Sequence, residues 1–285
     1  IKGLNPGMRS NIDVNGINDL LGPGGGSKLV ARNAEAAIKV ETGMKGVKIM
    51  NLMVSGGTEA KNIGIHFVGA TDNGMLSNII GINLHTGVKI EQAKNMQIVN
   101  CWVCELPNSI ELIGGENIVV KNCQLGAQPT GITCKVQEVN KLSFINNQVY
   151  PDGRENLVLD ACNNCVIEGN NFKSYYNGIL VLNGNDNTVN KNIFWLTGAV
   201  QNQLLDHGDD FGIINVKGNN NMVASNSLSC EWAYAGAVTV NAVQGTGNVF
   251  KNCFVDNLES YRVFLVNAQT EVSNCVSSDK VSIVE

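Results

Sequence analysis

The feature that most constrains this chain is a repeat marked by asparagine. Short apolar stretches that end in an asparagine recur along the sequence, for example "VKIMN" to Asn51 and "IVVKN" to Asn122. The series comprises Asn51, Asn78, Asn100, Asn122, Asn146, Asn170, Asn192, Asn226, Asn252 and Asn274, and most of its steps are 22–27 residues. A fixed period of this size is typical of a solenoid, in which each repeat packs on its neighbours.

A second series of apolar stretches lies out of phase with the first and has a similar step. It includes "GVKI" at Gly87, "SIEL" at Ser109 and "GILV" at Gly178. Two or three strands per period fit a coil of parallel strands, and parallel crossovers are right-handed. Leucine-rich repeats share the period, but their Leu-x-x-Leu-x-Leu frame is absent. The sequence therefore predicts an all-β, single-stranded right-handed parallel β-helix of the pectate-lyase-like kind, a solenoid that occupies 1–285 as one domain.

Asparagine suits the corners of such a coil. It tolerates left-handed backbone, and identical amides on successive coils can bond to one another. We therefore expect the series to stack into an asparagine ladder. Four cysteines directly follow asparagines of the series, which predicts a partial cysteine stack beside it: Cys101, Cys123, Cys253 and Cys275.

The composition argues against two classes of partner. Charged residues make up only 16% of the chain and the net charge is −5, whereas nucleic-acid binding needs clustered Lys and Arg. There is no apolar run of 18 residues, so no transmembrane helix is expected. The nine cysteines include two C-x-x-C pairs, but the pairs are too far apart for a zinc ribbon. We expect buried thiols, no metal site and no cofactor.

One repeat is longer than the others. The step from Asn192 to Asn226 is 34 residues, and the extra residues fall within 194–212. Insertions in solenoids emerge as loops on one face, where ligands often bind. This insertion carries Trp195, His207, Asp209 and Asp210, which are candidates for binding a polyol because sugars pack on rings and bond to carboxylates. A solvated acidic loop is the alternative.

A second acidic group lies in "YPDGRENLVLD". Asp152 and Glu155 are candidate catalytic carboxylates, and Arg154 could hold either of them ionised. Since "PDG" is ordinary turn chemistry, Asp152 could instead only initiate a corner.

With these residues in view, the chain resembles the inulin fructotransferase family, as a divergent member. The resemblance rests on "LGAQPTGIT" (125–133), "CNNCVIEGNNF" (162–172), "NGILVLNGNDNTVNKN" (177–192) and "GDDFGIINVKGNNNMVASNSL" (208–228). It implies a homotrimer of right-handed β-helices that cleaves a fructan by intramolecular transfer, or hydrolyses the resulting difructose anhydride, without a cofactor. It also implies that the N-terminal capping region is missing here.

The resemblance further implies two catalytic acids in the coil around "QPTGITCKVQEVN". Thr130 and Asn140 stand at those positions, and neither can act as a general acid. Glu138, two residues from the second position, could substitute if the register shifts by an even number. Otherwise Asp152 or Glu155, one coil on, would have to act.

Three hypotheses follow. The chain is a fructan-active enzyme of the fructotransferase type, a different polysaccharide lyase or epimerase, or a non-catalytic sugar-binding or structural homologue. The first two give it an oligosaccharide or polysaccharide substrate, and the replaced acids favour the third. The family suggests an extracellular protein, although cysteines without a disulfide-like framework suit a reducing compartment equally well.

Overall fold

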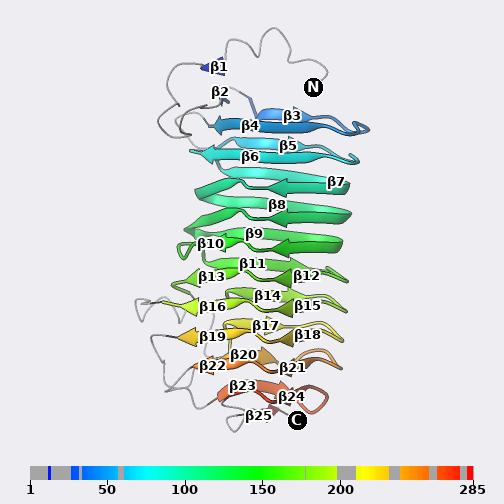
Figure 1. Cartoon of the computed structure of the whole chain (residues 1–285), viewed down its shortest axis with the longest axis vertical. Coiled ribbons are helices and arrows are strands. Elements are labelled where there is room, and N and C mark those ends of the chain that lie inside the picture. Colours follow the sequence, from blue (N-terminus) through cyan, green and yellow to red (C-terminus); the bar gives the residue numbers. More distant parts are fainter. Residues whose placement is uncertain are drawn as a thin grey trace.

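The chain winds into a solenoid of stacked coils made entirely of strands and turns over its described part (Figure 1). The computed structural model describes residues 12–13, 27–31, 34–56, 61–176, 178–197, 210–230, 238–256, 262–276 and 281–284. Within these ranges there is no helix of the length and apolarity needed to cross a membrane. The predicted parallel β-helix is confirmed, whereas a single domain over the whole of 1–285 stays a prediction.

Among the described residues, successive coils contribute strands to three parallel sheets. The first sheet contains β3 (Ala36–Val40), β5 (Ile63–Phe67), the start of β7 (Thr86–Val99), the middle of β8 (Trp102–Lys121) and β9 (Gln124–Ile145), β11 (Glu155–Asp160), β14 (Leu180–Asn183), β17 (Ile214–Val216), β20 (Val238–Ala242), β23 (Arg262–Asn267) and β25 (Val281–Val284).

The second sheet contains the starts of β4 (Lys48–Ser55) and β6 (Met75–Ile82), the ends of β7, β8 and β9, then β12 (Val166–Glu168), β15 (Thr188–Asn190), β18 (Met222–Ala224), β21 (Val249–Lys251) and β24 (Glu271–Ser273). The third contains β2 (Ser27–Val30), the ends of β4 and β6, the starts of β8 and β9, then β10 (Gln148–Val149), β13 (Asn171–Ser174), β16 (Ile193–Leu196), β19 (Ser227–Cys230) and β22 (Phe254–Asp256). The short β1 (Ile12–Asp13) runs antiparallel to β2.

The core is a set of columns in which equivalent residues of successive coils lie on one another. Leu157, Leu180 and Ile214 pair in register across β11, β14 and β17, and each is fully buried. Phe172 and Phe194 stack with ring centroids 5.0 Å apart and planes 2° from parallel. Because side chains alternate along a strand, each coil sends one set into this core and leaves the other outside.

The predicted asparagine series divides into two adjacent positions of the coil. Most of its members hold the left-handed corner itself, with φ of 51–55°: Asn51, Asn78, Asn100, Asn122, Asn146, Asn252 and Asn274. Asn170, Asn192 and Asn226 instead occupy the next position, which is buried. Prediction of a single column was therefore wrong by one residue, because the marker asparagine changes position between coils.

At the buried position four asparagines are joined by side-chain hydrogen bonds. Asn147 Nδ2 donates to Asn170 Oδ1 (3.0 Å), Asn170 to Asn192 (2.9 Å) and Asn192 to Asn226 (3.0 Å). The same Nδ2 groups also donate to buried carbonyls, as Asn192 does to Ile167 O (2.9 Å). Each amide thus satisfies backbone groups that the corner leaves without a strand partner.

The four cysteines continue this column rather than forming a second one beside it. Cys123 N donates to Asn147 Oδ1 (2.9 Å), and Cys101 N contacts Cys123 Sγ (3.5 Å). At the other end of the column Cys253 N contacts Cys275 Sγ (3.5 Å). The order along the column is therefore Cys101, Cys123, Asn147, Asn170, Asn192, Asn226, Cys253 and Cys275.

Candidate functional site

The corner that joins the third sheet to the first carries connecting segments of several lengths. Segments 128–131, 151–154 and 175–178 belong to successive coils, and the insertion joins the same two sheets one coil later. Arg154 N donates to Gly131 O (2.9 Å), and Gly178 N donates to Gly212 O (2.8 Å). The described residues of these segments therefore lie along one edge of the solenoid, which we call the loop edge.

The turn at 151–154 is held closely against the coil before it. A Cβ atom on Gly153 would lie 2.6 Å from Thr133 Oγ1 and 3.2 Å from Ala127 Cβ. Thr133 Oγ1 is itself fixed, since it accepts a hydrogen bond from Ala127 N (3.2 Å). A residue without a side chain is thus needed at Gly153, and the close packing fixes the two flanking carboxylates, Asp152 and Glu155, on the loop edge.

Glu155 is the first residue of β11 and lies opposite Ile132 of β9. Its side chain is 15% exposed, and its Oε1 lies 3.9 Å from Arg154 Nε. Burial raises the pKa of this carboxyl, against the smaller opposite effect of the Arg154 charge. Asp152 is exposed at the turn. A carboxyl with a raised pKa on the same turn as an exposed carboxylate is an arrangement that can perform acid–base chemistry.

Glu138 lies at the opposite end of the same sheet. It is exposed and forms the left-handed corner to the second sheet, with φ 55°. Glu155 aligns with Ile132, six residues before Glu138, and at about 3.3 Å per residue this separation is about 20 Å. Paired carboxyls of glycosidases lie about 5–9.5 Å apart. Within one chain Glu138 therefore cannot pair with Glu155.

The two positions at which the resemblance implies catalytic acids also lie at opposite ends of this sheet. Thr130 is exposed on the loop edge, just before the first sheet. Asn140 lies beyond the corner at Glu138, where it is bridged to Asn163 and its Oδ1 accepts a hydrogen bond from Asn164 Nδ2 (3.1 Å). Asn140 thus serves a structural column at the corner.

The insertion contributes Asp210 to the described residues, whereas His207 and Asp209 lie outside them. Asp210 is exposed, and its carbonyl accepts a hydrogen bond from Asn241 Nδ2 (2.5 Å).

Trp195 stands on the outer face of the third sheet, in β16. Lys173 of the preceding coil places its Nζ 4.8 Å from the Trp195 ring centroid. One coil earlier, Tyr150 donates its hydroxyl to Gln124 Oε1 (3.1 Å). Tyr150 leads directly into the turn that carries Asp152. Sequence reasoning overlooked Tyr150 and Lys173, although Tyr150 and Trp195 are separated by two periods of the repeat.

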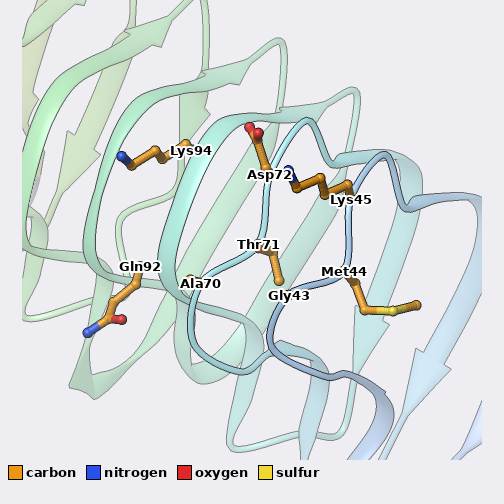
Figure 2. A pocket seen from close by; sticks show the side chains of 8 residues that line it. All are labelled: Gly43, Met44, Lys45, Ala70, Thr71, Asp72, Gln92 and Lys94. Atoms are coloured by element: carbon orange, nitrogen blue, oxygen red, sulfur yellow. The ribbon is translucent and has the colours of Figure 1, made fainter.

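A hollow of about 210 Å³ lies at another corner, between the first and second sheets near the N-terminal end. Figure 2 shows Lys45, Asp72 and Lys94 on successive coils beside it. Asp72 Oδ1 accepts a hydrogen bond from Asn95 Nδ2 (3.0 Å). The hollow contains none of the residues that the sequence predicted for a site.

Comparison with known proteins places the fold. A family described as a right-handed β-helix region matches residues 130–283. The chain belongs to this β-helix family. Comparison with curated protein sequences finds no match.

Solved structures show which β-helix proteins this member is similar to. DFA-IIIase from Arthrobacter chlorophenolicus, without its lid, is 22% identical with a TM-score of 0.74 over 88% of this chain and 69% of its own. The same enzyme in complex with GF2 is 21% identical, with a TM-score of 0.73 and the same coverage. PfbA, a surface adhesin of Streptococcus pneumoniae, is 11% identical with a TM-score of 0.54 over 91% of this chain and 84% of its own. The predicted resemblance to inulin fructotransferases is confirmed for the fold.

Proposed function

We propose that the chain acts on a fructan-type oligosaccharide or a difructose anhydride at the loop edge. The observation that carries the proposal is Glu155, a half-buried carboxyl with a raised pKa, three residues from the exposed carboxylate Asp152. Tyr150 and Trp195 supply ring surface on the adjoining face for the apolar sides of a sugar. Structures of DFA-IIIase, whose fold this chain shares, hold GF2 or DFA-III.

In the proposed reaction Glu155 is the general acid. It transfers its proton to the glycosidic oxygen as the bond from that oxygen to the anomeric carbon breaks. A hydroxyl of the same substrate, or a water molecule, forms the new bond to that carbon, and Asp152 accepts the proton that the attacking hydroxyl loses. The residues act without a cofactor, and the cyclic or hydrolysed product depends on which hydroxyl attacks.

The direction of the Glu155 pKa shift gives a pH dependence. Turnover needs the protonated acid, so it should fall as the pH rises through the raised pKa of Glu155. The same shift acts on stability. Since burial favours the neutral form, the folded state loses stability relative to the unfolded one as the pH rises through the folded-state pKa. Glu155→Gln should remove this loss while it abolishes proton transfer.

Incubation with inulin and with difructose anhydrides, followed by chromatography, tests the proposal. Glu155→Gln should lower turnover by about 10²–10⁴-fold, the usual contribution of a positioned acid. Glu168→Gln, the same change on the second sheet away from the loop edge, is the control and should leave turnover unchanged. Full turnover in Glu155→Gln would exclude Glu155 as the acid. Loss of turnover in Glu138→Gln alone would move the site to the other end of the sheet.

In a homotrimer Glu138 could contribute to a site shared between two subunits. Within one chain it is about 20 Å from Glu155 by the spacing of strand residues. We therefore propose a homotrimer, which light scattering after gel filtration would test. A monomer with full activity would contradict a shared site.

A non-catalytic sugar-binding or structural protein is the second candidate. It is favoured by Thr130 and Asn140 at the expected acid positions and by the fold likeness to the adhesin PfbA. Calorimetry with inulin oligomers separates the two functions. Binding with no product in the chromatographic assay would support this candidate.

A further inference from the structure

The buried column of cysteines and asparagines described above ends in two thiols on neighbouring coils, Cys253 and Cys275. Val276 N donates to Cys253 O (3.0 Å), so Cys253 and Cys275 lie directly beside each other. Cys253 N also contacts Cys275 Sγ (3.5 Å). Neighbouring strands lie about 4.8 Å apart, and disulfide-bonded cysteines have Cα atoms about 4.4–6.8 Å apart. The pair therefore has the spacing that a disulfide needs.

This pair lies on the last described coils, unlike the other cysteine pair of the column. Cys275 follows β24, and among the described strands nothing pairs with β24 on the side away from β21. The next residue, Val276, is 53% exposed. Cys101 and Cys123 are covered on both sides by further coils. Cys275 is itself buried at 6% exposure, but Cys253 and Cys101 are only 2% and Cys123 only 1% exposed, so a small reagent should reach Cys275 before the other three.

The electrostatics of the pair favour reaction at the same sulfur. Hydrogen bonding from the Cys253 thiol, opposed in part by burial, lowers the pKa of Cys275 to about 7. The backbone N–H of Cys253 contributes further to this lowering. The lowered pKa favours the thiolate form of Cys275, and the thiolate is the nucleophile in disulfide exchange.

We infer that Cys253 and Cys275 form a redox-active pair, which a small-molecule disulfide oxidises to a disulfide bond between the last coils. The Cys275 thiolate attacks one sulfur of the oxidant and releases its other half as a thiolate. Cys253 loses its proton to solvent, attacks Cys275 Sγ and displaces the second half of the oxidant. Two protein thiols are oxidised and one external disulfide is reduced to two thiols.

The bond would have a structural consequence for the last described coils. It would close a loop between positions 22 residues apart and tie the coil of β24 to the coil of β21. The inference does not depend on the carbohydrate proposal, since neither cysteine lies on the loop edge.

The experiment uses the full chain in its native state. It is incubated with oxidised glutathione, remaining thiols are alkylated, and peptides are analysed by mass spectrometry. The expected result is a Cys253–Cys275 linked peptide, lighter than the two free thiols by two hydrogen atoms, formed before any Cys101–Cys123 link. Complete alkylation of Cys253 and Cys275, or linkage of either to another cysteine, would overturn the inference.

Two variants check the order of the steps. In Cys253→Ser the mixed disulfide with glutathione should accumulate on Cys275, because no second thiol resolves it. Cys101→Ser is the matched control and should leave the rate of Cys253–Cys275 formation unchanged. Absence of glutathione from Cys275 in folded Cys253→Ser protein, as judged by circular dichroism, would show that Cys275 is not the attacking thiol. If that variant fails to fold, the result on the natural chain alone decides.

Discussion

The coils of residues 86–145 and those of residues 146–256 have different side chains at equivalent corners. Between the first and second sheets, the earlier coils pass the corner as continuous strands β7, β8 and β9, with Lys94 and Glu116 paired in register. In the later coils the strands break, and Asn185 donates to Asn163 Oδ1 (3.1 Å) and Asn219 to Asn185 Oδ1 (3.0 Å). Charged side chains of alternating sign at this corner in the earlier coils are thus replaced by amide side chains in the later coils.

The corner between the second and third sheets shows a similar change along the buried column, from Cys101 and Cys123 to the four hydrogen-bonded asparagines. An amide both donates and accepts, so a stack of asparagines satisfies its own members and adjacent backbone groups. Thiols are weak partners, and exposed charges are screened by salt. The comparison teaches that the later coils should owe more of their stability to buried side-chain hydrogen bonds.

The largest effect should come from breaking the buried ladder. Asn192→Ala removes the bonds to Ile167 O and Asn226 Oδ1 and leaves the Asn170 backbone N–H without its acceptor. Because buried polar groups then lack partners, we expect a loss of about 3 kcal/mol in the free energy of unfolding. Urea unfolding followed by circular dichroism measures it.

The matched control for this change is Asn183→Ala, which removes one exposed bond to Asp160 Oδ1 (2.7 Å). We expect it to cost about 0.5–1 kcal/mol, as an exposed hydrogen bond does. Equal losses in the two variants would contradict the claim that burial makes the ladder important.

Exchanging asparagine and cysteine at the point where they meet in the buried column should have an intermediate effect on the free energy of unfolding. Asn147→Cys removes the acceptor of Cys123 N and the donor to Val120 O, so we expect a loss of about 1–2 kcal/mol. Cys123→Asn extends the ladder by one amide that can donate to Asn147 Oδ1, and its expected cost is lower. Unfolding midpoints that rank the two variants in the reverse order would show that the column does not depend on amide bonding.

The smallest effect should come from the charged corner. Lys141 Nζ lies 2.6 Å from Glu116 Oε1, and this bond and the Lys141 charge lower the pKa of Glu116. The pair therefore stabilises the fold above the ordinary pKa of glutamate, and the gain is lost as the pH falls through the lowered pKa. Lys141→Met should lower the unfolding midpoint slightly at low salt.

Salt distinguishes this contribution from packing. At about 1 M salt the screening length is about 3 Å, and the effect of Lys141→Met should vanish. Lys191→Met, which breaks the pair with Glu168 (3.1 Å) in a later coil, should behave in the same way. A decrease that persists at high salt would assign the stabilisation to the methylene stem of Lys141 rather than to its charge.

The candidate site was partly visible in the sequence. The turn residues around Gly153 and the acids near it indicated a corner. The long repeat indicated a loop in the same region. The raised pKa of Glu155 was not visible, because it depends on burial of a residue that sequence alone places only on a strand. Tyr150 was missed because its place beside the turn becomes meaningful only when coils are stacked.

The sequence by itself determined the solenoid, since a period of about two dozen residues with alternating apolar positions leaves few other ways to bury the apolar side chains. Only the tertiary structure decided which asparagines are buried, that cysteines share their column, and that Glu138 is remote from Glu155. The physical reason is the corner. A left-handed residue there interrupts the strand alternation, and a shift of one position exchanges the inside and the outside of the coil.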